Sequence, residues 1–404
     1  MARDLLCDGR RLKLLLIALV GVAVTDLAFA NDSASRAQVS RRDLAQSSGK
    51  YLGHRWHIDP NHLMWWDGKP YVPFGGFGIE PGNEFGLRTY NLWIDLDPFA
   101  RNPQYTREQH RRDIAERLKR IADSGSTCIV QFSMAGPQML EGPGPDRKWE
   151  EPKGGVDASR LADPHVKRAI FKVWAEYAPA VRNECVRAVV LWNEINGWRW
   201  PDHTSDEKYA SLLAEYVREV KQVVGDLPVC LKIVGTWNSR TVIAAAGSAA
   251  DGLGFDIWFH HAHDTRASGD IERALRMLEA RQQRTTWFFI TEGGRGADLP
   301  ENSPVEDYWE RWPPFRSREE AAGILRGYAL GGAKGFIYNG PSSGADSKYR
   351  DSYRWLGQLK REITEIMIQT DISFGPPPPR SAKGAARAAR DDPRVQDMLQ
   401  SVGE

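Results

Sequence analysis

The sequence has few cysteines, almost no net charge, and no apolar run long enough to span a bilayer comfortably. Only 4 of its 404 residues are cysteine, and they form none of the close pairs of a metal site, so no disulfide framework is expected. A formal charge of +1 is not the excess of positive charge that would indicate binding to nucleic acid or to an anionic membrane surface. With 41% hydrophobic and 26% charged residues, the chain has an ordinary globular composition, sufficient for one large domain or two small ones.

The N-terminus has the pattern of an export signal. Arg10 and Arg11 precede an apolar stretch over 14–24, and Ala28-Phe29-Ala30 offers a small-x-small cleavage site. The apolar stretch is short, so we expect cleavage near Ala30 and a secreted or periplasmic protein rather than an anchored one. The composition further predicts a polar tether over 31–50, a folded domain over 51–372, and a mobile tail rich in Pro, Ala and Arg over 373–404.

Within the expected domain, short apolar runs alternate with longer helical patterns. The expected strands are 71–79, 89–96, 127–135, 188–192, 228–235, 254–260, 285–291 and 334–339. The expected helices are 106–123, 164–183, 205–224, 239–248, 268–283, 317–330 and 353–368. This alternation favours an α/β fold, a single (β/α)8 barrel, over a doubly wound sheet. Residues 80–86 replace the first helix, and 51–70 form a hairpin or plug at the N-terminal end of the barrel.

Two of the expected strands end in a glutamate. The fourth runs into Asn193 and Glu194, where a barrel presents side chains to substrate, although Glu194 alone is equally consistent with a cap or surface acid. The seventh runs into Glu292, which two glycines follow. Burial and like charge push two carboxylates at one rim towards different protonation states. Glycosidic cleavage needs such a pair.

Trp192-Asn193-Glu194 and Thr291-Glu292-Gly293, each after an apolar strand, resemble the clan A glycoside hydrolases, which are retaining (β/α)8 enzymes including cellulase-, mannanase- and β-galactosidase-like families. The resemblance covers nearly all of 71–340. It implies that Glu194 is the general acid/base, that Glu292 is the nucleophile, and that Asn193 binds a sugar 2-hydroxyl. It also implies double displacement through a covalent glycosyl-enzyme, with the carboxyl groups about 5–5.5 Å apart.

Other residues at the strand ends are softer candidates. The resemblance implies that His261 or His263, after strand six, orients the nucleophile; packing, substrate contact and a His-x-His metal pair stay open. It also implies an arginine on strand two, for which this chain offers Arg88 or the replacement Asn91. The remaining candidates are Trp198, Trp200, Trp237, Tyr338, Gln131 and Ser133. The resemblance implies that Tyr338 forms the floor of a sugar subsite, and each Trp is equally consistent with packing.

These patterns predict a secreted retaining glycoside hydrolase that cleaves β-glycosidic bonds of a poly- or oligosaccharide. We expect a carbohydrate substrate, no nucleic-acid partner, no cofactor and no metal. Two alternatives remain open: a catalytically weak barrel that binds glycans, and a metal-dependent hydrolase that uses the strand-six histidines. The long loops at 136–163 and 296–316 are compatible with exo-action from a pocket and with endo-action in a groove.

Overall fold

The computed structural model describes residues 44–94 except 78, 106–132, 162, 164–196, 207–297 except 237, 311–340 and 348–372. The expected signal over 1–30 and the expected tail over 373–404 lie outside these residues. No helix within them is both long and apolar enough to cross a membrane.

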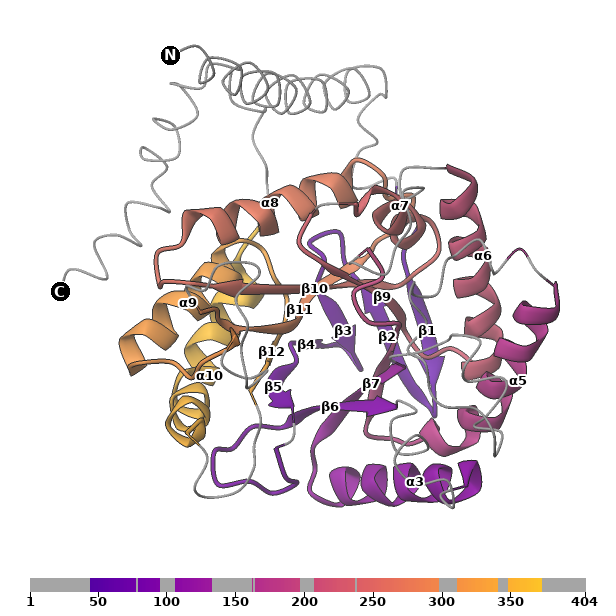
Figure 1. Cartoon of the computed structure of the whole chain (residues 1–404), viewed down its shortest axis with the longest axis horizontal. Coiled ribbons are helices and arrows are strands. Elements are labelled where there is room, and N and C mark those ends of the chain that lie inside the picture. Colours follow the sequence, from indigo (N-terminus) through magenta and orange to yellow (C-terminus); the bar gives the residue numbers. More distant parts are fainter. Residues whose placement is uncertain are drawn as a thin grey trace, which may run out of the picture. The chain divides into compact units, whose positions relative to one another are not determined.

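Parallel strands close into a barrel in which each strand pairs with the next along the chain, and the last pairs with the first (Figure 1). The strands are β5 (Phe74–Phe77), β6 (Thr89–Ile94), β7 (Thr127–Phe132), β8 (Val186–Leu191), β9 (Val229–Val234), β10 (Gly252–Phe259), β11 (Trp287–Arg295) and β12 (Phe336–Tyr338). They match the expected strands, and the (β/α)8 barrel is confirmed. The clearest difference is at β5, which begins only at Phe74 because Pro73 has no N–H to donate to a ladder.

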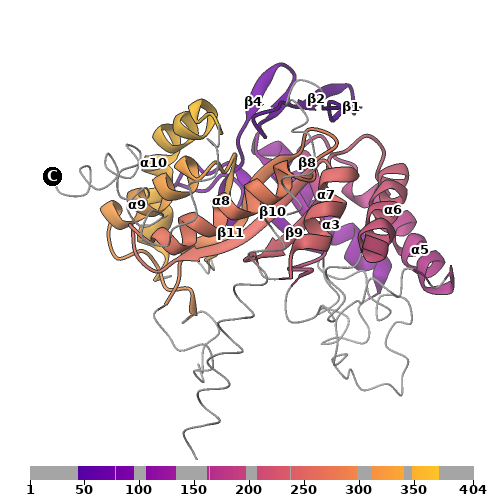
Figure 2. The same ribbon diagram turned by 90° about the horizontal axis from the view of Figure 1, so that it is seen from above.

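Helices alternate with these strands and surround them (Figures 1 and 2). They are α3 (Arg107–Asp123), α5 (Pro164–Val181), α6 (Glu207–Val224), α7 (Arg240–Ser248), α8 (Thr265–Glu279), α9 (Arg318–Leu330) and α10 (Arg350–Gln369). Helix α8 begins earlier than expected, because the Asp264 side chain caps it by accepting from the backbone N–H groups of Arg266 and Ala267. Residues 80–86 form turns where a first helix would stand, as expected.

A small antiparallel sheet closes the N-terminal end of the barrel. Its strands are β1 (Ser48–Tyr51), β2 (His54–Ile58), β3 (Met64–Trp66) and β4 (Lys69–Tyr71), which lie together at one side of the barrel in Figure 2. The Trp56 indole donates to the carbonyl of Asp226, just before β9, at 2.6 Å. The His62 ring contacts the carbonyl of Thr286, just before β11, also at 2.6 Å. The expected plug is therefore confirmed as a four-stranded sheet.

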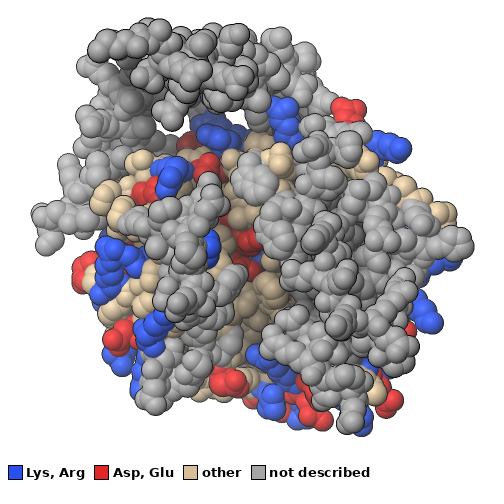
Figure 3. Space-filling view, viewed as in Figure 1, with Lys and Arg blue, Asp and Glu red and all other residues tan. Residues whose placement is uncertain are grey.

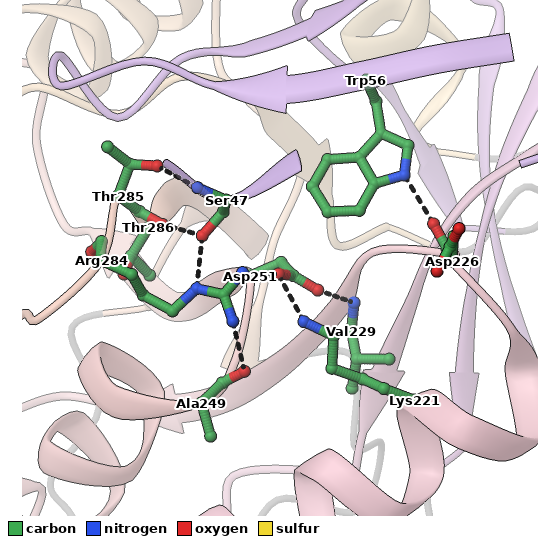
Figure 4. A network of polar contacts seen from close by, with 10 residues as sticks. All are labelled: Ser47, Trp56, Lys221, Asp226, Val229, Ala249, Asp251, Arg284, Thr285 and Thr286. Atoms are coloured by element: carbon green, nitrogen blue, oxygen red, sulfur yellow. Dashed lines mark hydrogen bonds and ion pairs between the residues drawn. The ribbon is translucent and has the colours of Figure 1, made fainter. Parts of the chain in front are cut away.

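The described residues begin before residue 51, within the segment for which composition predicted a tether. Ser47 is fully buried; its N–H donates to Thr285 Oγ1 at 2.8 Å, and its hydroxyl accepts from Arg284 Nε at 2.6 Å (Figure 4). Residues 48–50 then enter β1. Composition missed this because the segment is held by polar contacts to distant residues, which its own sequence does not reveal.

The same network continues to a buried carboxylate, Asp251, which immediately precedes β10 (Figure 4). Asp251 is fully buried and pairs with Lys221 at 2.7 Å and Arg284 at 3.0 Å. Its second oxygen accepts from the N–H of Val229, the first residue of β9, at 3.0 Å. One side chain thus ties the starts of β9 and β10 to α6, which carries Lys221, and to Arg284 ahead of β11.

Candidate active site

A layer of polar side chains crosses the barrel interior towards the C-terminal ends of the strands. Hydrogen bonds or ion pairs join its members into one network. Six consecutive strands contribute to it, and the members are Asn91 on β6, Gln131 on β7, Asn193 after β8, Lys232 on β9, Asp256 on β10 and Glu292 on β11. All are buried except Asn193, which is half-buried. A connected polar layer inside an apolar barrel is costly unless every member is satisfied.

Lys232 is the hub of this network. Its side chain is fully buried, and its ammonium contacts Asn193 Oδ1 at 2.7 Å, Asp256 Oδ2 at 2.9 Å and Glu292 Oε1. A lysine ammonium has three N–H donors, and its hydrogen bonds go to Asn193, Glu292 and, at 3.5 Å, Gln131 Oε1. The contact with Asp256 Oδ2 is an ion pair without a hydrogen bond. The ammonium also lies 5.1 Å from the centre of the Trp93 ring, within the range of a cation–π contact.

The charges around Lys232 decide its protonation state. Burial by itself lowers the pKa of Lys232, but the carboxylates of Asp256, Glu292 and Glu194 together outweigh burial, and the pKa is raised. The lysine is therefore a permanent cation at neutral pH. Because Glu194 and Glu292 both act on this one ammonium, the two strand-end acids lie within electrostatic reach of a common point.

The same cluster also changes the pKa of Asp256. Burial raises the pKa of its carboxyl well above the usual value, and the negative charges of Glu292 and Glu194 add to the increase. Lys232 and a 2.6 Å hydrogen bond from Thr291 Oγ1 act against it without reversing it. One ammonium therefore faces three carboxyl groups, and Asp256 is the one whose pKa is raised by burial.

A bulge in β11 aims Glu292 into the barrel. Phe255 of β10 pairs with Ile290, but the next residue, Asp256, pairs with Glu292, so Thr291 is the extra residue. In a regular strand, Thr291 and Glu292 would point to opposite faces. Here the Thr291 hydroxyl contacts Asp256 and the Glu292 carboxylate contacts Lys232. Residue 254, opposite the bulge, is a glycine, and a Cβ there would collide with the Thr291 side chain.

Glu194 stands on a sharp turn after β8. Trp192 and Glu194 have φ of 61° and 46°, in the left-handed region that residues other than glycine rarely adopt. The turn is fixed on both sides: Trp192 stacks on Tyr216 with ring centres 4.7 Å apart, and the Asn196 side chain exchanges two 2.8 Å hydrogen bonds with the backbone of Val234. Strained backbone held by its surroundings is typical of functional sites. Glu194 itself remains half-exposed.

The contacts of Asn193 fix the orientation of its amide. Its Oδ1 accepts from Lys232 and, at 3.1 Å, from Gln131 Nε2. Because lysine can only donate, the oxygen must face Lys232 and the Nδ2 group must face away from it. Asn193 thus keeps an N–H donor for a partner beyond the network.

The two candidates on strand two, Arg88 and Asn91, lie in different surroundings. Arg88 is exposed and donates to the carbonyl of Ser124 at 2.7 Å, before β6 begins. Asn91 lies in the polar layer, where its Nδ2 donates to Gln131 at 3.3 Å. The cation that contacts Glu292 is neither of these residues but Lys232, from strand five.

The remaining candidates lie apart from this network or outside the described residues. Tyr338 is 1% exposed and is stacked on Phe315 at 5.2 Å, so protein covers its ring. His261 and His263 are exposed on the loop after β10, and their rings stack at 6.0 Å. Within the described ranges, no group of three or more His, Cys, Asp or Glu residues could hold a metal ion. Those outside the described residues are Ser133, Trp198, Trp200 and Trp237.

Lys232 and Asp256 were missed at the level of the sequence, although a signal exists. Each is the single charged residue of its strand, within Val-Cys-Leu-Lys-Ile-Val and Gly-Leu-Gly-Phe-Asp-Ile-Trp-Phe. Parallel barrel strands are normally apolar throughout, and lysine is almost never fully buried unless it is paired. A charge inside such a strand therefore predicts a partner across the barrel.

No protein-family model and no curated protein matches the chain. Solved structures with a similar fold include the endo-β-1,4-mannanase of Thermotoga petrophila, with 11% identity, TM-score 0.46, and coverage of 75% of this chain and 78% of that one. A glycoside hydrolase family 5 enzyme from Prevotella bryantii B14 has 12% identity, TM-score 0.46, and coverage of 70% and 83%. An exo-β-1,4-mannosidase from Opitutaceae bacterium strain TAV5 has 10% identity, TM-score 0.46, and coverage of 80% and 62%. Likeness at this level assigns no activity to the chain.

Proposed function

We propose that this chain is a retaining glycoside hydrolase of the clan A type that cleaves β-glycosidic bonds of a poly- or oligosaccharide. The observation that carries the proposal is that the ends of strands four and seven meet at the buried Lys232, whose ammonium contacts Glu292 and the Asn193 side chain next to Glu194. Glu292 contacts a permanent cation, which suits a nucleophile that must be ionised. Glu194 stands half-exposed on a strained turn, which suits an acid that must meet a leaving group.

In the proposed reaction, Glu194 donates its proton to the glycosidic oxygen while a Glu292 oxygen attacks the anomeric carbon. The bond between that carbon and the leaving oxygen breaks, and an ester to Glu292 forms. Glu194, now ionised, then removes a proton from water as the water oxygen attacks the same carbon and releases Glu292. The Nδ2 group of Asn193 donates to a sugar hydroxyl during both steps.

A neutral substrate agrees with the charge distribution. The chain carries a formal charge of +1, and basic and acidic side chains are interspersed on the face seen in Figure 3. A different barrel chemistry, in which a buried lysine amine attacks a carbonyl, requires an unprotonated amine. The raised pKa of Lys232, caused by carboxylates that outweigh its burial, disfavours that chemistry.

The test uses Glu292→Ala and Glu194→Ala on aryl β-glycosides and a glycan panel. We expect each to lose at least about 10³-fold in kcat/KM, with partial rescue of one variant by azide. Proton NMR of the first-formed product should show the anomeric configuration of the substrate. Glu279→Ala is the matched control, since Glu279 ends α8 and lies 3.5 Å from His62 at the other end of the barrel. Parent-like rates in both variants would refute the assignment, and binding of glycans without turnover by the parent would favour the glycan-binding alternative.

We also propose that residues 1–30 direct export and that the mature chain begins at Asn31. The support is the order of basic residues, an apolar stretch and Ala28-Phe29-Ala30 in the sequence.

A further inference from the structure

We propose that Lys232 is a positioning residue of this site: its buried ammonium holds the Glu292 carboxylate and the Asn193 amide in place. This inference rests on the proposed function for its meaning in catalysis. Its physical content, a cation that specifically stabilises one carboxylate, can be measured without any substrate.

The geometry leaves Lys232 no direct role towards substrate. Its side chain is fully buried, and its ammonium donates to Gln131, Asn193 and Glu292. Asp256 Oδ2 lies beside it at 2.9 Å. Trp93 lies on another side of the ammonium, with its ring centre 5.1 Å away. Lys232 can therefore influence a reaction only through the groups that it holds.

The groups that Lys232 holds are the proposed nucleophile Glu292 and the amide of Asn193, which lies beside the proposed acid Glu194. Lys232 contacts the Glu292 carboxylate directly and fixes which way the Asn193 amide faces. It also aligns the turn that carries Glu194, because its backbone carbonyl accepts from the N–H of Ile195 at 3.1 Å. One residue of strand five thus sets the positions of groups from strands four and seven.

Three carboxyl groups surround Lys232. The titratable groups that face the ammonium are Asp256 from β10, Glu292 from β11 and Glu194 from the turn after β8. Glu292 contacts the ammonium and Asp256 lies 2.9 Å from it, so removing the ammonium would leave both buried carboxyl groups without their common cation, which is costly. The bulge at Thr291 contributes by placing the Thr291 hydroxyl against Asp256 and the Glu292 carboxylate against Lys232.

The first experiment is a double-mutant cycle in urea, which needs no activity. Lys232→Met and Glu292→Gln are made singly and together, with Lys232→Gln as a second variant that keeps an N–H donor should the methionine variant not fold. In the parent background, Glu292→Gln should lower the urea midpoint, because the ion pair is lost. In either Lys232 background it should raise the midpoint, because it removes a buried carboxylate that has lost its cation. The same change in both backgrounds would overturn the proposal.

The second experiment tests the link to catalysis on the full-length enzyme, through the acidic limb of the pH profile of kcat/KM. Lys232→Met should move this limb to higher pH, because a cation in contact with a carboxylate favours the ionised form. The matched control is Lys334→Met. Lys334 is also fully buried, but it donates to the backbone carbonyls of Met367 and Thr370, so its loss should lower stability without moving the limb. An unmoved limb in Lys232→Met would overturn the inference.

The two experiments separate the possible failures. If the parent hydrolyses no glycoside, the proposed function fails, and the urea cycle alone still decides whether Lys232 stabilises the Glu292 carboxylate. If the parent is active and Glu292→Ala abolishes activity, the proposed function stands and the acidic limb decides the role of Lys232.

Discussion

Asp251→Ala tests whether the N-terminal end of the barrel serves stability rather than chemistry. Asp251 is fully buried, pairs with Lys221 and Arg284, and accepts from the N–H of Val229. Removing one partner of a buried charge network costs about 3–5 kcal/mol. The Lys221 and Arg284 side chains are 23% and 24% exposed, so both can recover hydration, and the lower end of that range applies. We therefore expect a loss of about 3 kcal/mol in the free energy of unfolding, part of it from the unpaired Val229 N–H.

The assay is urea unfolding followed by both fluorescence and circular dichroism, since coincident curves justify a two-state free energy. Asp123→Ala is the control. Asp123 pairs with Lys119 at 2.6 Å, closer than either Asp251 pair, but the two side chains are 62% and 72% exposed. This exposed pair should contribute less than about 0.5 kcal/mol. Below the unfolding transition, Asp251→Ala should retain the parent kcat/KM.

Two results would refute this reasoning. A loss no larger than that of Asp123→Ala would mean that burial adds nothing to the Asp251 pairs. A fall in kcat/KM of the still-folded variant would mean that the two ends of the barrel are not separable.

The remaining predictions concern the thiols and the N-terminus. Burial raises the pKa of Cys185 to about 12 and those of Cys128 and Cys230 well above the usual value, so all three should resist thiol reagents until the protein unfolds. Since the unfolded chain releases these protons first, each thiol should lower the free energy of unfolding by about 1.4 kcal/mol per pH unit above the unfolded pKa. Urea curves at rising alkaline pH check this, and a constant free energy would contradict it. Mass spectrometry of the exported chain should show Asn31 as its first residue, and an intact N-terminus in the extracellular protein would rule the cleavage out.

Most of the fold could be predicted because the barrel strands are apolar runs and the helices between them have helical spacing. Strand ends were harder, because they depend on local chemistry. Pro73 delays β5, and the Asp264 cap starts α8 early. The segment around Ser47 was misassigned for a different reason: its partners, Thr285 and Arg284, are more than two hundred residues away in the sequence.

The site was predictable only in part. The ends of strands four and seven pointed to Glu194 and Glu292, because the end of a strand fixes where the next side chain emerges. The contact of Glu292 with the polar layer depends on the bulge at Thr291, and no periodicity reveals one inserted residue. Lys232 was not among the predicted site residues, because the run 228–235 indicated only an apolar barrel strand. Its burial becomes intelligible only when its carboxylate partners are known.

The two ends of the barrel bury charge in opposite ways. At the N-terminal end, one buried carboxylate, Asp251, has two cations that reach solvent, so its charge is compensated twice and the arrangement stabilises the fold. At the C-terminal end, one buried cation, Lys232, faces three carboxyl groups, so compensation is incomplete. Incomplete compensation costs stability, and a proposed glycoside hydrolase would use such a cluster because acid and nucleophile must differ in protonation.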